Sequence, residues 1–239
     1  MISVLTTPRR TEYLRDTLHS IDLAGAELFF DKTVFVDGPV TGTIRQNLLP
    51  GWQVKGLHPL SKGTRLSLWR ILNTAARKGV HSLLHFEDDV RLCRNAIPAM
   101  LAIDVPGWAG FLSFFQQNKN MPGGEGFHSL PTGQEWWGAQ SLKFPERSLL
   151  KFRDEKSAPP TAHFGMQCDV WIGQRLTGCV LLPSIVRHVG LRTTIETQAG
   201  ETLSGESIHR AGLHYVGDEF DALTHPFCPP TSARTGFGQ

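Results

Sequence analysis

The first 115 residues alternate between short apolar runs and segments with helical spacing, and this alternation most strongly constrains the fold. Residues 2–6 and 33–36 are apolar runs of the buried-strand type, and residues 52–57 fit a third, shorter strand. A helix is predicted after the first run and another after Gly63. Because strands that alternate with helices usually pair in parallel, we expect a mostly parallel sheet with helices on both faces.

Both predicted helices carry boundary signals and an apolar stripe. Thr11 is a suitable N-cap for the first helix. Lys78-Gly79 is a typical C-terminal stop for the second. The two stripes, each at helical spacing, are Leu14, Leu18 and Ile21 in the first helix and Leu66, Trp69, Leu72 and Ala76 in the second.

A fourth apolar run, residues 83–86, leads directly into three acids, Glu87, Asp88 and Asp89. Side chains alternate along a strand, so we expect Glu87 and Asp89 to share one face while Asp88 points to the other. Two neighbouring carboxylates repel each other unless a cation lies between them. A divalent cation that also binds phosphate meets this need, because such ions take one or two carboxylates plus phosphate oxygens. A solvated acidic turn is the alternative interpretation.

Polar residues follow three of the predicted strands at the point where each strand ends. In an α/β sheet, ligands bind beyond the carboxyl ends of the strands. Lys62 and Arg65 lie near the predicted start of a helix, and a helix N-terminus also favours anions. We therefore expect an anion-binding site at one edge of the sheet. The polar groups are Thr6, Thr7 and Arg9 after the first strand, Asp37 after the second, and Glu87–Asp89 after the fourth.

The second half of the chain is less regular. Residues 108–115 predict a strand, and a long loop over residues 116–135 follows it. A loop of that length in a compact domain is usually a functional lid or a mobile segment. Further elements are predicted as helices over 146–154 and 168–176 and a strand over 179–182. We find no internal repeat, so the chain is interpreted as one domain.

Composition restricts the functional classes. The 24 basic and 22 acidic residues nearly cancel, which argues against tight non-specific nucleic-acid binding as the main role but allows a local basic groove. The sequence has neither a secretion signal nor a long apolar segment, so we expect a cytoplasmic protein without a membrane span. Its four cysteines lack Cys-x-x-Cys spacing and are expected to be reduced and mostly buried: Cys93, Cys168, Cys179 and Cys228.

Four stretches, in order along the chain, resemble the GT-A class of nucleotide-sugar-dependent glycosyltransferases. They are residues 4–9, 34–38, 83–89 and 183–190. The third is similar to the Asp-x-Asp motif, with Glu as its first acid. The fourth, Pro-Ser-Ile-Val-Arg-His-Val-Gly, resembles the Pro-Ser-x-x-x-His-x-Gly segment of bacterial and N-acetylglucosaminyl transferases. The resemblance implies a single GT-A-like domain over 1–239, with a nucleotide-binding half (1–115), an acceptor-binding half (116–220) and an irregular tail (221–239).

The same resemblance implies a metal-dependent hexosyl- or pentosyltransferase that uses a UDP-sugar and Mn²⁺ or Mg²⁺. Asp89 and His188 are the expected metal ligands, although a hydrogen-bonded, partly buried histidine is the alternative for His188. Glu87 would contact the ion through water, or the ribose, whereas Asp88 would be structural or touch the sugar. Asp37 would accept a hydrogen bond from the base or the ribose of the nucleotide. The alternative is an ordinary aspartate in a turn. The expected nucleotide-binding set is Thr6, Thr7, Arg9, Asp37, Lys62, Arg65, Glu87 and Asp88.

An inverting transfer requires a general base that deprotonates the acceptor hydroxyl. Asp169, at the start of a predicted helix, lies where the class often places such a carboxylate. A simple N-terminal helix charge is the alternative. Glu135 is a second candidate base, and one of Trp136 and Trp137 is expected to stack on the acceptor.

Several functional alternatives stay open. The acceptor is expected to be a saccharide, but a hydroxymethylated base in phage DNA is the alternative. A nucleotidyltransferase would usually carry a Gly-rich phosphate loop after the first strand, where this chain has residues 6–10, Thr-Thr-Pro-Arg-Arg. A non-catalytic nucleotide-sugar-binding module is the remaining possibility. The DNA alternative is favoured by the basic residues Lys143, Arg147, Lys151 and Arg153.

Overall fold

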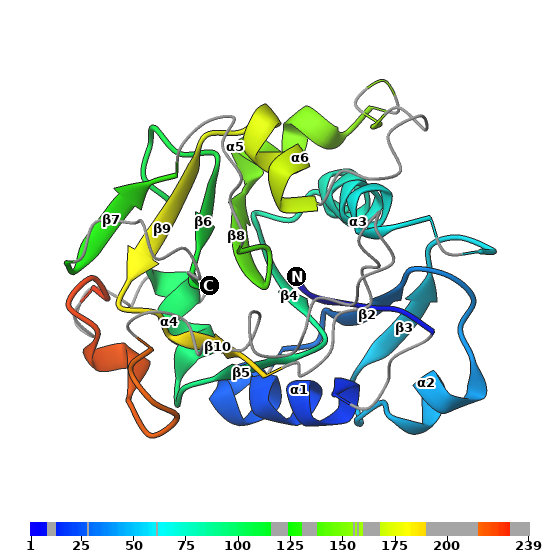
Figure 1. Ribbon diagram of the computed structural model, residues 1–239, viewed down its shortest axis with the longest axis horizontal. Helices are drawn as coiled ribbons and strands as arrows, with labels where there is room; N and C mark the ends of the chain where they lie inside the picture. The colour runs from blue at the N-terminus through cyan, green and yellow to red at the C-terminus, as the bar shows by residue number, and fades with distance from the viewer. Residues whose placement is uncertain are drawn as a thin grey trace, which may run out of the picture.

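A central sheet of eight strands organises the protein, in the order β3-β2-β1-β4-β8-β6-β9-β7 (Figure 1). The structure is a computed structural model that describes residues 1–8, 13–27, 29–60, 62–115, 124–130, 138–154, 156, 158–159, 168–189 and 215–229. The strands of this sheet are β1 (Ile2–Thr6), β2 (Lys32–Val36), β3 (Gln53–Gly56), β4 (Ser82–Glu87), β6 (Phe111–Ser113), β7 (Gly126–Ser129), β8 (Ser141–Pro145) and β9 (Gly178–Leu182).

The sheet has a parallel part and a mixed part. Strands β3, β2, β1 and β4 are all parallel to their neighbours. Strand β8 then pairs antiparallel with both β4 and β6, β6 pairs parallel with β9, and β7 closes the edge antiparallel to β9. A separate two-stranded antiparallel sheet joins β5 (Val90–Leu92) to β10 (Val186–His188). The predicted mostly parallel sheet is therefore confirmed, with antiparallel strands in its second half.

Helices cover both faces of the sheet, as predicted. One apolar core lies under α1, η1 and α4, and the other lies under α3, α5 and α6. In Figure 1 these two sets of helices lie on opposite sides of the strands. The helical segments are α1 (Leu14–Ile21), η1 (Asp22–Ala26), α2 (Gly42–Gln46), α3 (Thr64–Lys78), α4 (Ala96–Ala102), α5 (Glu146–Leu149), η2 (Leu150–Phe152), α6 (Cys168–Arg175) and η4 (Ala222–Thr224).

Adjacent residues of β1 and β2 contribute to opposite cores, as strand alternation requires. Val4 and Val34 face the first core, whereas Leu5 and Phe35 face the second. All five residues of each strand are buried. A strand with helices on both faces has no solvent side, which explains why these runs read as continuously apolar.

The predicted boundaries of the first half agree with the structure. The stripe of α1 is buried, and α3 ends at Gly79, which adopts the left-handed conformation (φ 66°) of a C-terminal cap. Thr11, the predicted N-cap of the first helix, lies outside the described residues. No helix in the described part of the chain is long and apolar enough to cross a membrane. All four cysteines are free thiols, and all except the half-buried Cys228 are buried.

Three predictions for the second half need correction. The strand predicted over residues 108–115 is shortened to β6, because Trp108 lies in a turn with its side chain 52% exposed. The loop predicted over residues 116–135 contains β7, which pairs with β9, far away in sequence. The helix predicted over residues 146–154 is a single α-helical turn, α5, followed by the 3₁₀ turn η2.

Candidate active site

The carboxyl ends of β1, β2 and β4 meet at one edge of the sheet. Thr6 is in register with Val36, and Leu5 is in register with Glu87. The backbone N–H of Asp37 donates to the carbonyl of Thr6 at 2.9 Å. The structure therefore brings together Thr6, Asp37 and the acidic triplet, as the alternation of strands and helices predicts.

Strand β4 ends at Glu87, so Asp88 and Asp89 form the turn that leads into β5. The strand alternation predicted through the triplet therefore stops after Glu87, and this prediction is corrected. Each of the three acids has different neighbours, which the turn rather than the strand pleat determines.

Asp88 forms hydrogen bonds with residues of β1 and α1. Its carboxylate accepts a short hydrogen bond from the hydroxyl of Thr6, which is buried. Its backbone carbonyl accepts from the hydroxyl of Thr17 on α1 at 2.8 Å. The same hydroxyl accepts from the backbone N–H of Val90 at 3.2 Å. Thr17 thus holds both sides of the turn through hydrogen bonds. It was not predicted as a functional residue, although a polar residue within the apolar stripe of α1 was a usable signal.

Asp89 forms a close pair with His188 from the second half of the chain. Nε2 of His188 lies 2.9 Å from Oδ2 of Asp89, and the backbone N–H of Val189 donates to the carbonyl of Asp89 at 2.8 Å. A neutral imidazole that donates from Nε2 to the Asp89 carboxylate would have a free lone pair on Nδ1. The ring of Phe115 packs against the imidazole, with their centroids 6.4 Å apart.

Two polar atoms of this pair are buried without a hydrogen-bond partner in the described part of the chain, namely Oδ1 of Asp89 and Nδ1 of His188. The two side chains are only 15% and 8% exposed, respectively. Buried polar atoms normally have partners, so an unpartnered pair of this kind indicates a ligand.

Glu87 lies in the strongest negative field of the site. Burial raises the pKa of its carboxyl well above the ordinary value, and the charge of Asp89 is the next cause. Asp169 and then Asp88 raise this pKa further. Three carboxylates therefore act on Glu87, two from the turn after β4 and one from α6.

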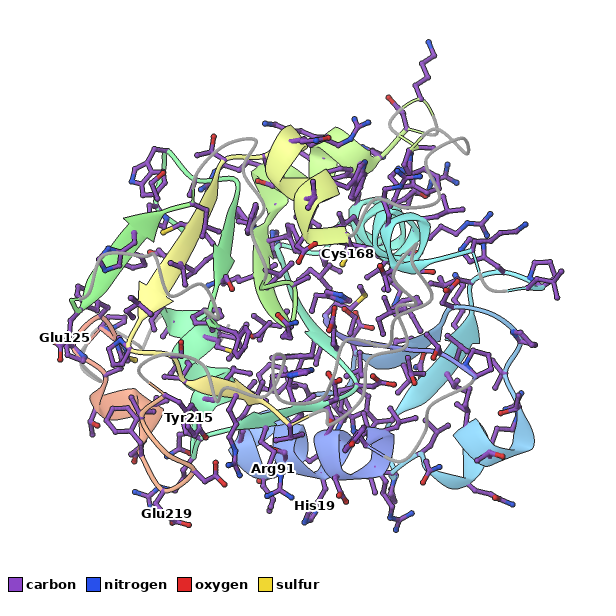
Figure 2. All side chains as sticks on the ribbon, in the orientation of Figure 1. His19, Arg91, Glu125, Cys168, Tyr215 and Glu219 are labelled. Carbon is purple, nitrogen blue, oxygen red and sulfur yellow. The ribbon has the colours of Figure 1, made fainter. Side chains whose placement is uncertain are left out.

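Asp169 lies in the first turn of α6 and is buried. One of its carboxylate oxygens accepts from the backbone N–H of Val170 at 2.9 Å. The preceding residue, Cys168, is labelled in Figure 2 at the beginning of α6 beside α3. Burial raises the pKa of the Cys168 thiol well above its ordinary value, and the charges of Asp169 and Glu87 act in the same direction. The thiol is therefore neutral and takes no part in the negative cluster.

Asp37 holds the start of α3 in place. Its two carboxylate oxygens accept from the backbone N–H groups of Lys62 and Gly63, each at 2.9 Å, and the residue is almost completely buried. Gly63 has φ 92°, a conformation that a residue with a side chain rarely adopts, and this turns both N–H groups toward the carboxylate. The carboxylate of Asp37 thus has a structural role at the site edge.

The predicted basic groups occupy different environments. Lys62 is exposed at the start of α3. Arg65 is buried in the first turn of α3, where burial lowers the pKa of its guanidinium and the charge of Arg175 lowers it further. Thr7 is half-buried beside Thr6. Arg9, Glu135, Trp136 and Trp137 lie outside the described residues.

The basic residues taken to favour a DNA acceptor do not form a groove at this site. Lys143 lies on β8 and is buried, with Nζ donating to the carbonyls of Met100, Leu101 and Ile103 at 2.9, 3.0 and 2.7 Å. Arg147 donates to three further backbone carbonyls. Both residues support the end of α4 and the segment after it, so this part of the sequence argument is corrected.

The site contains candidate ligands for a divalent cation. No group of three or more His, Cys, Asp or Glu residues in the described chain is arranged to hold a metal by itself. A hard cation needs only one or two carboxylates when a diphosphate supplies further oxygens. Oδ1 of Asp89 is unpartnered in the described part of the chain, and Glu87 is nearby in a field that a cation would relieve. These residues fit Mn²⁺ or Mg²⁺ bound together with a phosphate ligand.

Comparison with known proteins gives matches in structure but not in sequence. No protein-family profile and no curated protein matches the chain. The galactosyltransferase LgtC, in complex with donor and acceptor sugar analogues, is 13% identical with a TM-score of 0.47, covering 87% of this chain and 93% of that one. TarS from S. aureus in complex with UDP-GlcNAc is 14% identical with a TM-score of 0.47, covering 77% of this chain and 57% of that one.

A third solved structure, a putative glucose-1-phosphate thymidylyltransferase from Bacillus anthracis, is 9% identical with a TM-score of 0.47. The match covers 78% of this chain and 88% of that one. At these identities the likeness concerns the fold alone.

Proposed function

We propose that this protein is a metal-dependent glycosyltransferase that transfers a sugar from a UDP-sugar to a hydroxyl of a saccharide, with inversion. The observation that carries the proposal is the convergence of four carboxylates at one sheet edge, with a strongly raised pKa at Glu87. Such crowding is unfavourable without a cation, and a hard cation held by few carboxylates completes its shell with phosphate oxygens. A nucleotide diphosphate sugar is the substrate class that brings a diphosphate and a transferable group together.

Asp89 would hold Mn²⁺ or Mg²⁺ through Oδ1, which has no partner in the described part of the chain. Nδ1 of His188 lies on the far side of the ring from Asp89, so His188 would become a second ligand only by giving up its Nε2 hydrogen bond. The bound ion supplies neutralisation of the charge that develops on the leaving diphosphate. The hydrogen bond from Nε2 of His188 fixes the orientation of the Asp89 carboxylate, as partners of metal ligands commonly do. Glu87 would either contact the ion through a water molecule or contact the ribose hydroxyls.

The nucleotide would lie across the ends of β1 and β2. Thr7 and Arg9 follow β1, and Lys62 and Arg65 stand at the start of α3, where the N-terminal end of the helix favours the phosphates. Asp37 would act mainly by holding the Lys62-Gly63 turn in the shape that exposes this helix end. Thr6 and Asp88 would fix the turn that carries Asp89.

Asp169 would be the general base. As the acceptor oxygen attacks the anomeric carbon, its proton passes to the Asp169 carboxylate and the bond from that carbon to the diphosphate oxygen breaks. The position of Asp169 in the first turn of α6 favours the ionised carboxylate that a base requires. Glu135 remains a second candidate for this role.

The decisive experiment measures nucleoside diphosphate release from a panel of UDP- and GDP-sugars with Mn²⁺. We expect turnover by the wild type and a loss of roughly 10²–10³-fold in Asp89→Asn, the size of effect seen when a group stabilising transition-state charge is removed. Asp31→Asn is the matched control. It is the same substitution just before β2, at the opposite edge of the sheet, and it should retain full activity.

Each other outcome has a definite meaning. If the wild type binds no nucleotide sugar, the proposal fails. If Asp89→Asn is fully active, the metal assignment is wrong. Formation of pyrophosphate from a nucleoside triphosphate and a sugar phosphate would identify a nucleotidyltransferase instead, and binding without turnover would identify a binding module. Parallel assays with saccharides and with hydroxymethylated DNA oligonucleotides would separate the two acceptor classes.

A further inference from the structure

His58 is a buried histidine with an unpartnered ring nitrogen, in the loop that leads from β3 to α3. The residue is 7% exposed. Its Nε2 atom is buried and has no hydrogen-bond partner in the described part of the chain. Buried polar atoms normally have partners, so this imidazole indicates a ligand.

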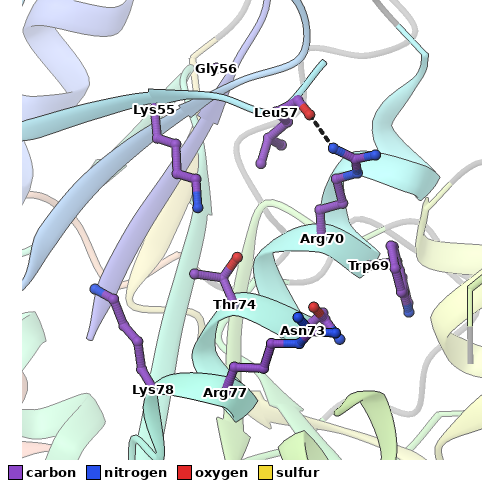
Figure 3. Close-up of a pocket in the computed structure, with 9 residues that line it drawn as sticks. All are labelled: Lys55, Gly56, Leu57, Trp69, Arg70, Asn73, Thr74, Arg77 and Lys78. Atoms are coloured by element: carbon purple, nitrogen blue, oxygen red, sulfur yellow. Dashed lines mark hydrogen bonds between the residues drawn. The ribbon is translucent and has the colours of Figure 1, made fainter. Parts of the chain in front are cut away.

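The loop that carries His58 is attached to the end of β2 on both sides. On one side, the backbone N–H of Leu57 donates to the carbonyl of Val36 at 2.9 Å. On the other side, two backbone N–H groups at the start of α3 donate to the carboxylate of Asp37. Arg70 on α3 also donates to the carbonyl of Leu57, as the dashed line in Figure 3 shows. His58 is therefore held near the carboxyl end of β2.

The ring of His58 is neutral at pH 7. Burial lowers its pKa from the ordinary value of 6.5, and the charge of Arg70 lowers it further. Asp37 raises this pKa and Lys62 lowers it, so both residues lie close enough to act on the ring. A neutral imidazole has one N–H donor and one acceptor nitrogen. The ring therefore suits an uncharged part of a ligand that can form hydrogen bonds.

The order of the strands places His58 at one end of the proposed nucleotide site. In the order β3-β2-β1-β4, the candidate metal ligand Asp89 follows β4, whereas His58 follows β3. These two strands are three spacings apart, which is about 14 Å at about 4.8 Å per spacing. The base and the terminal phosphate of a nucleoside diphosphate lie at opposite ends of the molecule. With the diphosphate at the metal end, the base therefore extends toward β3 and His58.

We propose that Nε2 of His58 hydrogen-bonds to the edge of the uracil base and so contributes to the choice of nucleotide. This inference rests on the proposed function, because it concerns the base of the same UDP-sugar. The residues assigned above serve the phosphates, and Asp37 mainly holds the turn at the start of α3. Uracil presents an N–H group between two carbonyl groups, so its edge offers a partner to either tautomer of the ring.

The test is calorimetric titration of UDP in the presence of Mn²⁺, which requires no turnover. His58→Leu should weaken UDP binding about tenfold, the effect expected when one hydrogen bond is lost and its partner is left unpaired. The affinity for inorganic pyrophosphate with Mn²⁺ should stay the same, because this ligand has no base. His81→Leu, the same substitution at an exposed histidine just before β4, is the matched control and should change neither affinity.

Several results would overturn the proposal. Unchanged UDP affinity in His58→Leu would do so, and so would an equal loss of pyrophosphate affinity, because the substitution would then act through the fold. A second probe needs no substitution. The wild type should bind 3-methyl-UDP, in which the N–H of the uracil edge is blocked, about tenfold more weakly than UDP, and equal binding would contradict the contact. UDP binding without sugar transfer would contradict the proposed function but leave the contact of His58 intact, so the two failures are distinguishable.

Discussion

The two halves of the molecule are built on different principles. In the first half, β1, β2, β3 and β4 are parallel, and a helical segment lies between each strand and the next along the chain. In the second half, β7 and β8 run antiparallel to their neighbours and depend on partners that are distant in sequence. The first half thus follows one regular strand–helix alternation, although β1 and β4 are distant in sequence, whereas antiparallel strands interrupt this order in the second half.

The candidate active site lies where the halves meet. The first half provides the edge with Glu87, Asp88 and Asp89, and the second half provides Asp169 and His188. This division suggests that the first half binds the nucleotide while the second half completes the chemistry. Variants in each half test that division.

Replacement of Asp169 by Asn should separate binding from chemistry. The variant keeps the size of the side chain but removes the base, so we expect turnover to fall by roughly 10²–10⁴-fold. The affinity for the nucleotide should change little, because the first half would supply the nucleotide contacts. Steady-state kinetics combined with calorimetric titration of UDP measures both quantities.

Asp154→Asn is the control for that experiment, since it changes an exposed acid of the second half. The control should match the wild type in both kinetics and affinity. Full turnover in Asp169→Asn would disprove the assignment of the base and would direct attention to Glu135. An equal loss of nucleotide affinity and turnover would contradict the division between the halves.

The sequence predicted the first half well because its signals are local. The run of residues 2–6, the stripe of α1 and the stop at Gly79 each follow from periodicity or backbone preference within a few residues. Placement of Asp37 and Glu87 at one edge then followed from the rule for parallel sheets.

Other features could not be predicted because they depend on contacts between distant segments. Strand β7 pairs with β9, which lies about 50 residues further along the chain. The turn at Asp88 replaces the expected strand alternation because Thr6 and Thr17, from elsewhere in the chain, hold it. Lys143 looks like a surface cation in the sequence, yet the carbonyls at the end of α4 enclose it. No local pattern encodes these partners.

Lys143 provides a test of how the second half supports the first. Burial lowers the pKa of its amine from 10.5 to about 8, although Asp104 acts in the opposite direction. Between pH 8 and 10.5 the unfolded chain therefore binds more protons than the folded one, and stability should rise with pH in this window. Relative to Lys143→Met, the wild type should gain at most about 3 kcal/mol in unfolding free energy over this range.

Urea denaturation at several pH values measures this difference. Taking the difference between wild type and variant cancels the titration of all other groups. Lys151→Met changes an exposed lysine of the same half, and its difference from the wild type should stay constant with pH. A wild-type advantage over Lys143→Met that falls as the pH rises would show that the amine is not destabilised by burial.

The smallest effect is expected at His188, through which the second half acts on the metal ligand of the first. His188→Ala removes the Nε2 hydrogen bond that orients Asp89 and any ligation through the ring, so it should weaken Mn²⁺ binding in the presence of UDP by about 10–100-fold. His188→Gln can still donate to Asp89 but supplies no ring nitrogen, so it should recover only part of this loss.

His81→Gln, at an exposed histidine just before β4, should bind Mn²⁺ like the wild type. Full recovery in His188→Gln would show that His188 only positions Asp89, and unchanged affinity in His188→Ala would exclude it from the metal site altogether. UDP affinity without metal should be equal in all four proteins, because the proposed nucleotide contacts do not include His188.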